Sequence, residues 1–304
     1  MLQRIVGYIR TFFILLIRSA SYFKDSNPLI YSAATAFFCT FSISPIIVIL
    51  HYLLSLYFEE EVMKKELFNI LTGTFGAETS GAIKTIVENF HALDTNWFVT
   101  VGGFVFLIFV ATTLLHVVKQ ALNHIWQVRR KHVNVIRYNF VERVKAAILI
   151  LLIGVLFITS FFLDSSVSLL HDYFHRVIPR AHGVVHFISD LIGPLIVTAW
   201  FTMLFKILAD ARVHISVAFL GGLLTASLFM CGKWVLARIL LYSSVVTIFG
   251  ASASFALILL FIFYSSIILY YGASFTYLLG IEMQKPIKPG KYSDRYEIKV
   301  IGED

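Results

Sequence analysis

The feature that most constrains this chain is a run of 43 residues, 239–281, that contains neither a charged residue nor a proline. As one helix it would be roughly 65 Å long, about twice the thickness of the hydrocarbon core of a bilayer. We therefore expect a break, with a turn at residues 242–249 on the outer side and a new helix beginning at TIFGASAS. Non-helical backbone at membrane depth must be buried in protein or line a water-filled cavity, and Gly and Ser suit both.

Composition predicts an all-α polytopic membrane protein. Hydrophobic residues make up 58% of the 304 residues and charged residues only 14%, which excludes an ordinary soluble domain. We expect six transmembrane helices in a domain of residues 27–281, preceded by an interfacial helix at 1–26 and followed by a cytoplasmic tail at 282–304. The predicted spans are 28–57, 97–121, 143–164, 184–209, 213–240 and 247–281.

The first 26 residues have the pattern of a basic amphipathic helix. The basic residues Arg4, Arg10, Arg18 and Lys24 fall within an arc of about 160° on a helical wheel. An apolar arc lies opposite and contains Ile5, Tyr8, Ile9, Phe12 and Leu16. Such a helix is expected to lie in the membrane interface and to favour anionic lipid. The alternative is a plain first helix packed on the bundle.

The distribution of basic residues predicts the orientation. With six spans, 18 of the 25 Lys and Arg residues fall on the side that holds both termini. The positive-inside rule then makes both termini cytoplasmic, and the location is a bacterial inner membrane. Pro286, Pro289 and Gly290 indicate a flexible cytoplasmic end. Residues 58–96 are expected to form short helices on the outer surface.

Small and hydroxylated residues are the candidates for a translocation path. In the first span, Ser32, Ala36, Thr40 and Ser44 recur every four residues, and Pro45 is expected to kink the helix. Small residues at this spacing allow close helix packing in lipid, and hydroxyls also suit a polar lining. The candidates for such a lining are Ser32, Thr40, Ser44, Pro45, Thr247, Gly250, Ser252 and Ser254.

Charged residues near span ends are candidates for binding an anionic head group. Lys233 and Arg238 interrupt the outer half of the fifth span, and His116 and Lys119 lie near the inner end of the second. Snorkelling to the interface is the alternative for these side chains. We expect Lys206, Asp210 and Arg212 to form an ordinary charged turn.

The third loop carries histidines at the spacing of metal ligands. His171 and His175 are four residues apart, as are His182 and His186, and Asp190 follows after four more. This spacing places side chains on one helix face, where they can ligate Zn²⁺ or a similar ion. Because no complete zinc motif is present, exposed titrating histidines are the alternative.

Several segments resemble the YihY/BrkB family of bacterial inner-membrane proteins, formerly labelled ribonuclease BN. They are NPLIYSAATAFFCTFSISP, NHIW at 123–126, DARVHISVAFLGGLLTA, IFGASAS and LLFIFYSSIILYYGASFT. The resemblance covers residues 26–281 and implies six spans with a basic cytoplasmic second loop. The chain departs from the family where Phe249 replaces Tyr, Phe261 replaces Trp and Ser274 replaces an intramembrane Glu. The last change puts a shared proton-coupled role in doubt.

The function expected from these patterns is movement of a lipid or amphipathic anion between leaflets. The alternative is a non-transporting membrane scaffold whose basic loop or tail recruits a partner. Ribonuclease activity, the legacy family name, is not expected, because no clustered His and carboxylate set faces the cytoplasm. We expect no enzyme activity, no cofactor and no nucleic-acid partner, with anionic membrane lipids as the partners.

Overall fold

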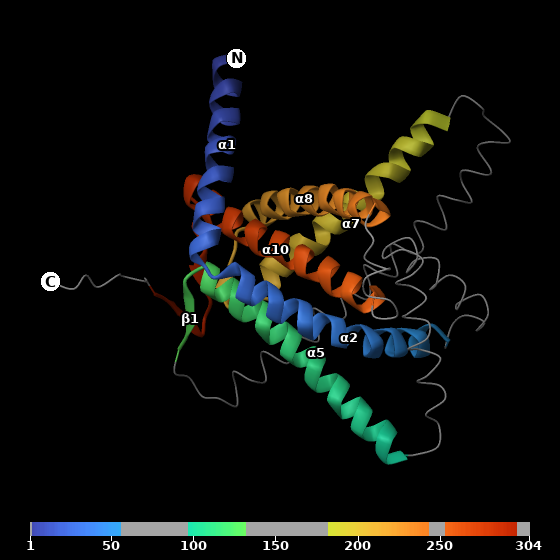
Figure 1. Ribbon diagram of the computed structural model, residues 1–304. Helices are drawn as coiled ribbons and strands as arrows, with labels where there is room; N and C mark the ends of the chain where they lie inside the picture. Colours follow the sequence, from blue (N-terminus) through green and yellow to red (C-terminus); the bar gives the residue numbers. More distant parts are fainter. Residues whose placement is uncertain (1, 56–96, 132–181, 243–252, 297–304) are drawn as a thin grey trace. The chain divides into compact units, whose positions relative to one another are not determined.

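The computed structural model describes residues 2–55, 97–131, 182–242 and 253–296 (Figure 1). Helices dominate, and four strands of two or three residues join them near the chain's turns. The elements are α1 (Leu2–Asp25), α2 (Pro28–Ser55), α5 (Trp97–Ile125), β1 (Val128–Arg130), α7 (His182–Ile207), β2 (Ala211–Arg212), α8 (Ile215–Tyr242), α10 (Ala253–Glu282), β3 (Lys288–Pro289) and β4 (Ser293–Arg295). The described part of the chain is therefore mostly helical, as the sequence predicts, with short strands that it did not predict.

Helices occupy five of the six expected spans. The span expected at 143–164 lies outside the described residues, as do the surface helices expected at 58–96. Within the described part, Ile215–Val235 and Ile258–Glu282 are long and apolar enough to cross a membrane. Pro28–Ser42 and Gly193–Ile207 are shorter apolar helical segments. The number of spans and their orientation stay predictions.

The chain divides into two compact units. The first comprises residues 1–28, 119–232 and 268–304, and the second comprises residues 29–118 and 233–267. The first unit therefore contains α1, the end of α5, α7, most of α8, the end of α10 and all four strands. The second contains nearly all of α2, most of α5, the end of α8 and the start of α10.

Helix α1 packs on the second half of α10 through residues of its apolar arc. The ring of Phe12 lies 5.9 Å from that of Phe275, and the hydroxyl of Tyr271 donates to the carbonyl of Leu16 at 3.0 Å. Tyr22 stacks on Tyr277 at 5.2 Å. The face turned away from α10 exposes Phe13, Ile14 and Ile17 together with Arg10 and Arg18. Residues 12–23 of α1 thus contact α10, and the interfacial location of the helix stays a prediction.

Three helices end at residues with a left-handed backbone. Asn27, Gln127 and Gln284 follow α1, α5 and α10 and have φ values of 51°, 54° and 55°. Such residues terminate a helix and let the chain turn sharply. Helix α2 then begins at Pro28, as predicted, because the first helical position needs no N–H donor.

Helices α8 and α10 pack through a reciprocal pair of glycines and threonines. A Cβ at Gly272 would lie 1.9 Å from Oγ1 of Thr225, and a Cβ at Gly221 would lie 2.0 Å from Oγ1 of Thr276. Because ascending numbers on α8 pair with descending numbers on α10, the helices are antiparallel here. Each threonine hydroxyl donates to the glycine carbonyl of its own helix, at 2.7 Å and 2.6 Å. This seam is close packing with its polar groups satisfied.

The C-terminal segment up to Tyr296 is bound to the first unit, contrary to the flexible end that the sequence suggested. Strand β4 pairs antiparallel with β1, and β3 pairs with β2. The backbone N–H of Tyr296 donates to the carbonyl of Gln127, and that of Lys131 to Tyr292, both at 3.0 Å. Residues 283–296, called the strap below, thus contain Pro286, Pro289 and Gly290 in an ordered segment.

The seam gives a matched test of packing. Gly272→Ala should destabilise the protein by about 1–3 kcal/mol, because the new methyl overlaps Thr225, whose β-branched side chain cannot turn away. Gly193→Ala, on α7, has nothing within 4 Å of the added Cβ and should be neutral or slightly stabilising. Thermal unfolding of both variants in detergent measures this. Equal stability of the two variants would contradict the close approach.

Candidate functional site

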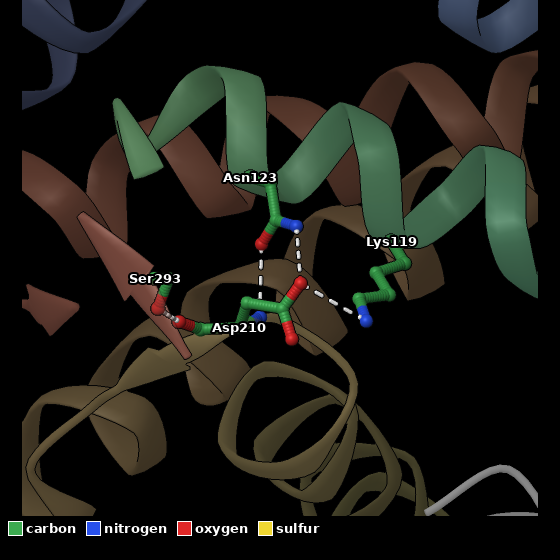
Figure 2. Close-up of polar contacts among 4 residues, drawn as sticks. All are labelled: Lys119, Asn123, Asp210 and Ser293. Atoms are coloured by element: carbon green, nitrogen blue, oxygen red, sulfur yellow. Dashed lines mark hydrogen bonds and ion pairs between the residues drawn. The ribbon is translucent and has the colours of Figure 1, made fainter. Parts of the chain in front are cut away.

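The buried carboxylate of Asp210 lies at the centre of a polar cluster in the turn between α7 and α8. Its Oδ2 contacts the ammonium of Lys119 at 3.0 Å and accepts from Nδ2 of Asn123 at 3.1 Å (Figure 2). The backbone N–H of Asp210 also donates to Oδ1 of Asn123 at 2.9 Å. Because Lys119 and Asn123 are four residues apart, α5 presents both side chains on one face. The side-chain exposures of Lys119 and Asp210 are 9% and 7%.

The backbone carbonyl of Asp210 binds the C-terminal strap. It accepts from the N–H of Gly290 at 2.8 Å. It also accepts from the hydroxyl of Ser293 at 2.6 Å (Figure 2). A Cβ at Gly290 would lie 2.8 Å from this carbonyl oxygen, so the close approach requires a glycine. One residue therefore joins α5, the α7–α8 turn and the strap.

The segment NHIW at the end of α5 extends this junction. Asn123 bonds Asp210, and Nδ1 of His124 lies 3.0 Å from the hydroxyl of Tyr296. The carbonyl of Ile125 accepts from the hydroxyl of Tyr22 in α1. Trp126 is fully buried and donates its indole N–H to the carbonyl of Ala273 in α10 at 3.0 Å. Four consecutive residues thus reach four different parts of the first unit.

Aromatic hydroxyls close the junction on the side of α1. Arg295 donates to the hydroxyl of Tyr277 at 2.9 Å, and Tyr277 stacks on Tyr22. Burial raises the pKa of Tyr22 well above its ordinary value, and the neighbouring Tyr277 and Tyr296 raise it further. Tyr22 is therefore a neutral hydrogen-bond donor at physiological pH.

The Asp210 cluster is suited to holding α5, the α7–α8 turn and the strap in place. Every polar group of Asp210 that the structure shows has a partner within the protein, and the ion pair satisfies its buried charge. Ser274, where the resemblance noted above implied a Glu, is fully buried and donates to the carbonyl of Tyr270 at 3.0 Å. No group of three or more His, Cys, Asp or Glu side chains suited to a metal ion occurs among the described residues.

The predicted lining residues are only partly described. Ser32 and Thr40 are buried in α2; the hydroxyl of Thr40 donates to the carbonyl of Ala36 at 2.7 Å. The Ser32 hydroxyl has no hydrogen-bond partner in the described part of the chain. Helix α2 continues through Ser44 and Pro45, and α10 through Ser254, but their side chains lie outside the description, as do Thr247, Gly250 and Ser252 entirely.

The predicted anion-binding residues have different environments. Lys233 and Arg238 are exposed on α8, and the guanidinium of Arg238 lies over the ring of Trp234 at 5.3 Å. His116 is exposed on α5, whereas Lys119 is buried and paired with Asp210. The structure thus assigns Lys119 an internal partner. The prediction that Lys206, Asp210 and Arg212 form an ordinary charged turn is wrong for Asp210. Its side chain is buried, whereas those of Lys206 and Arg212 are exposed.

The predicted metal ligands are not tested by side-chain geometry. His182, His186 and Asp190 lie on α7, and their side chains are outside the description. His171 and His175 lie wholly outside the described residues. The histidine site therefore stays a prediction.

Sequence patterns did not identify Asn123, Trp126 or Ser293 as site residues. The available signal was the spacing of Lys119 and Asn123, which places a cation and an amide one turn apart near the end of an apolar helix. A second signal was Asp210, a lone acid directly after an apolar helix. Nothing local indicated that Ser293, about 80 residues later, would contact the same turn.

Comparison with known proteins finds a family of membrane proteins. The family model described as virulence factor BrkB matches residues 20–297. A UPF0761 membrane protein of Pseudomonas paraeruginosa is 28% identical over 235 residues, covering 76% of this chain and 54% of that protein. Its counterpart in Saccharophagus degradans is 26% identical, with 76% and 51% covered. One in Legionella pneumophila is 25% identical over 232 residues, with 75% and 52% covered. The chain spans about half the length of these relatives, and no solved structure matches it.

The buried ion pair predicts a strong effect of charge removal. Asp210→Asn should destabilise the protein by about 3–5 kcal/mol, because it removes the carboxylate that lies 3.0 Å from the buried Lys119 ammonium. The double variant Lys119→Met/Asp210→Asn should lose less than Asp210→Asn alone. Asp294→Asn, which removes the exposed pair with Lys131, should change stability by at most about 1 kcal/mol. Unfolding midpoints measure all three, and a double variant that loses as much stability as Asp210→Asn, or more, would contradict the pairing.

We expect His124 to make the thermal stability of the protein depend on pH. Burial lowers the pKa of His124, and neutral Nδ1 can accept the hydroxyl of Tyr296 whereas the protonated ring cannot. The folded pKa lies below the unfolded value of about 6.5, so this contribution is present above that pH and is lost as the pH falls toward the folded pKa. Between pH 8 and pH 5 the wild type should therefore lose more thermal stability than His124→Gln. Parallel curves would contradict this role.

Proposed function

Because the chain belongs to the BrkB family of membrane proteins, we propose that it moves a lipid or an amphipathic anion between the leaflets of a bacterial inner membrane. The proposal takes the six spans and cytoplasmic termini from the sequence. In this function the chain has no catalytic role, no cofactor and no nucleic-acid partner, and it is not a ribonuclease.

The observation that carries the proposal is an exposed cationic and aromatic group at one end of α8. The candidate span Ile215–Val235 ends beside Lys233, Trp234 and Arg238. Trp234 is 64% exposed, and Arg238 lies over its ring. Within the described part of the chain, neither cation pairs with a carboxylate. Exposed Trp beside Lys and Arg is typical of the membrane–water interface, where both cations can contact phosphate head groups.

The hydroxyl of Ser32 supports a polar route along α2. It is fully buried and has no hydrogen-bond partner among the described residues. By contrast, the hydroxyls of Thr40 and Ser42 donate to carbonyls one turn earlier at 2.7 Å each. An unsatisfied buried hydroxyl costs about 1–3 kcal/mol, so water or a polar substrate group is its expected partner. The proposed lining includes the predicted Thr247, Ser252 and Ser254.

A membrane scaffold is the second candidate function, and the α8–α10 seam favours it. Thr225 and Thr276 already donate within their own helices, so their hydroxyls are not free to line a path. The bound strap and the basic surface around it could then recruit a protein partner. The two candidates differ in whether the protein alone moves lipid.

Leaflet exchange tests the proposal. Liposomes containing the purified protein and a fluorescent anionic phospholipid are treated with a membrane-impermeant quencher, and exchange is compared with protein-free liposomes. Exchange should exceed the background and fall about 5- to 30-fold in Lys233→Ala/Arg238→Ala, because each cation near an anionic surface contributes about 1 kcal/mol. The charge-matched control Lys131→Ala/Lys291→Ala should exchange at the wild-type rate. If the protein is folded and inserted but shows no exchange, the transport proposal is wrong and the scaffold function is favoured.

A second pair of variants separates lining from packing. Ser32→Ala should slow exchange and leave stability unchanged or higher, because it removes a buried hydroxyl without a partner. Ser42→Ala removes a bonded hydroxyl and should lower stability by about 1 kcal/mol without slowing exchange. If both variants behave alike in both measurements, Ser32 does not line the route.

A further inference from the structure

Two cations lie directly opposite each other in the short sheet that attaches the strap. Arg212 of β2 is the cross-strand partner of Lys288 of β3. Directly opposed residues of an antiparallel pair project from the same face of the ladder, with Cβ atoms about 5 Å apart. Both side chains are exposed, whereas Ala211, on the other face, is buried. The pair therefore faces outward from the first unit.

This arrangement is electrostatically unfavourable without an anion. Like charges directly opposite each other destabilise a strand pair. The strap elsewhere carries the opposite arrangement, because Lys131 and Asp294 form an ion pair at 3.0 Å. Within the described ranges, neither Arg212 nor Lys288 has a carboxylate at ion-pair distance. An external anion would remove the repulsion and satisfy both charges.

The pair lies beside the ends of two candidate spans. Arg212 precedes the span Ile215–Val235 by three residues, and Lys288 follows the span Ile258–Glu282 by six. Ile215 at the start of α8 is 56% exposed, and Ile281 at the end of α10 is 48% exposed. Exposed cations next to exposed apolar side chains match the boundary between lipid head groups and acyl chains.

We propose that Arg212 and Lys288 form a binding site for the phosphate of an anionic phospholipid, whose acyl chains contact the neighbouring apolar surface of α8 and α10. The site joins the α7–α8 turn to the strap, so a bound lipid also stabilises the β2–β3 pairing. This site is separate from Lys233 and Arg238 and exists whether or not the protein moves lipid.

Native mass spectrometry of the full chain in neutral detergent measures this binding. The protein is titrated with phosphatidylglycerol or with phosphatidylcholine of the same acyl chains. The wild type should bind phosphatidylglycerol more tightly, and Arg212→Gln/Lys288→Gln should weaken its first binding step by about 5- to 30-fold. Lys131→Gln/Lys291→Gln also removes two positive charges, one directly after β1 and one in the strap, and should leave that step unchanged, because Lys131 already has Asp294 as its partner.

The outcomes that overturn the site are distinct. Equal weakening by both double variants would show a general charge effect without a site. Displacement of the lipid by equimolar glycerol phosphate would show a site for soluble phosphates. Binding of a single-stranded RNA oligomer that is lost in Arg212→Gln/Lys288→Gln, with no preference for phosphatidylglycerol, would assign the surface to nucleic acid. Absence of leaflet exchange would leave this binding unaffected.

Thermal unfolding provides an independent check that does not depend on transport. In neutral detergent, Arg212→Gln/Lys288→Gln should unfold at or above the wild-type temperature, because it removes a like-charge pair. Added phosphatidylglycerol should raise the unfolding temperature of the wild type and of Lys131→Gln/Lys291→Gln, but not that of Arg212→Gln/Lys288→Gln. A lower unfolding temperature of Arg212→Gln/Lys288→Gln without lipid, or an equal rise for all three proteins, overturns the proposal.

Discussion

The buried charge of Asp210 is the constraint on which the first unit depends. A carboxylate removed from water needs a counter-charge and hydrogen bonds, and Lys119 and Asn123 of α5 supply both (Figure 2). These contacts hold the end of α5 against the α7–α8 turn. The carbonyl of the same residue then accepts two bonds from the strap. Satisfying one buried residue therefore determines the relative positions of three segments that are distant in sequence.

Close backbone approach provides the second constraint. Gly221 and Gly272 leave room for Thr276 and Thr225 of the opposite helix, so α8 and α10 pack closely without an unsatisfied hydroxyl. Trp126 anchors the same part of α10 through the carbonyl of Ala273. In lipid, where apolar side chains give little driving force for association, such packing and hydrogen bonds hold helices together. The junction thus combines polar contacts and small residues with buried apolar side chains such as Trp126 and Phe205.

These contacts divide the chain's basic residues by role. Lys119 neutralises an internal charge, whereas Lys233, Arg238, Arg212 and Lys288 remain exposed beside the ends of candidate spans. The proposed functions rest on this second group, because an exposed cation at the interface is available to a phosphate and a buried, paired one is not. The basic excess from which the sequence predicts the orientation also supplies the candidate lipid contacts. One compositional feature can therefore serve both topology and binding.

The sequence by itself determined the class of protein, the family and the positions of the helices. Long apolar runs, Pro28 at a helix start and the absence of charge between Arg238 and Glu282 are local properties, and local properties decide where a helix can form in lipid. Only the tertiary structure decided that Asp210 is buried, that Lys119 is its partner and that the strap is bound. Those facts depend on contacts between residues more than 75 positions apart, and neither hydropathy nor spacing encodes such contacts.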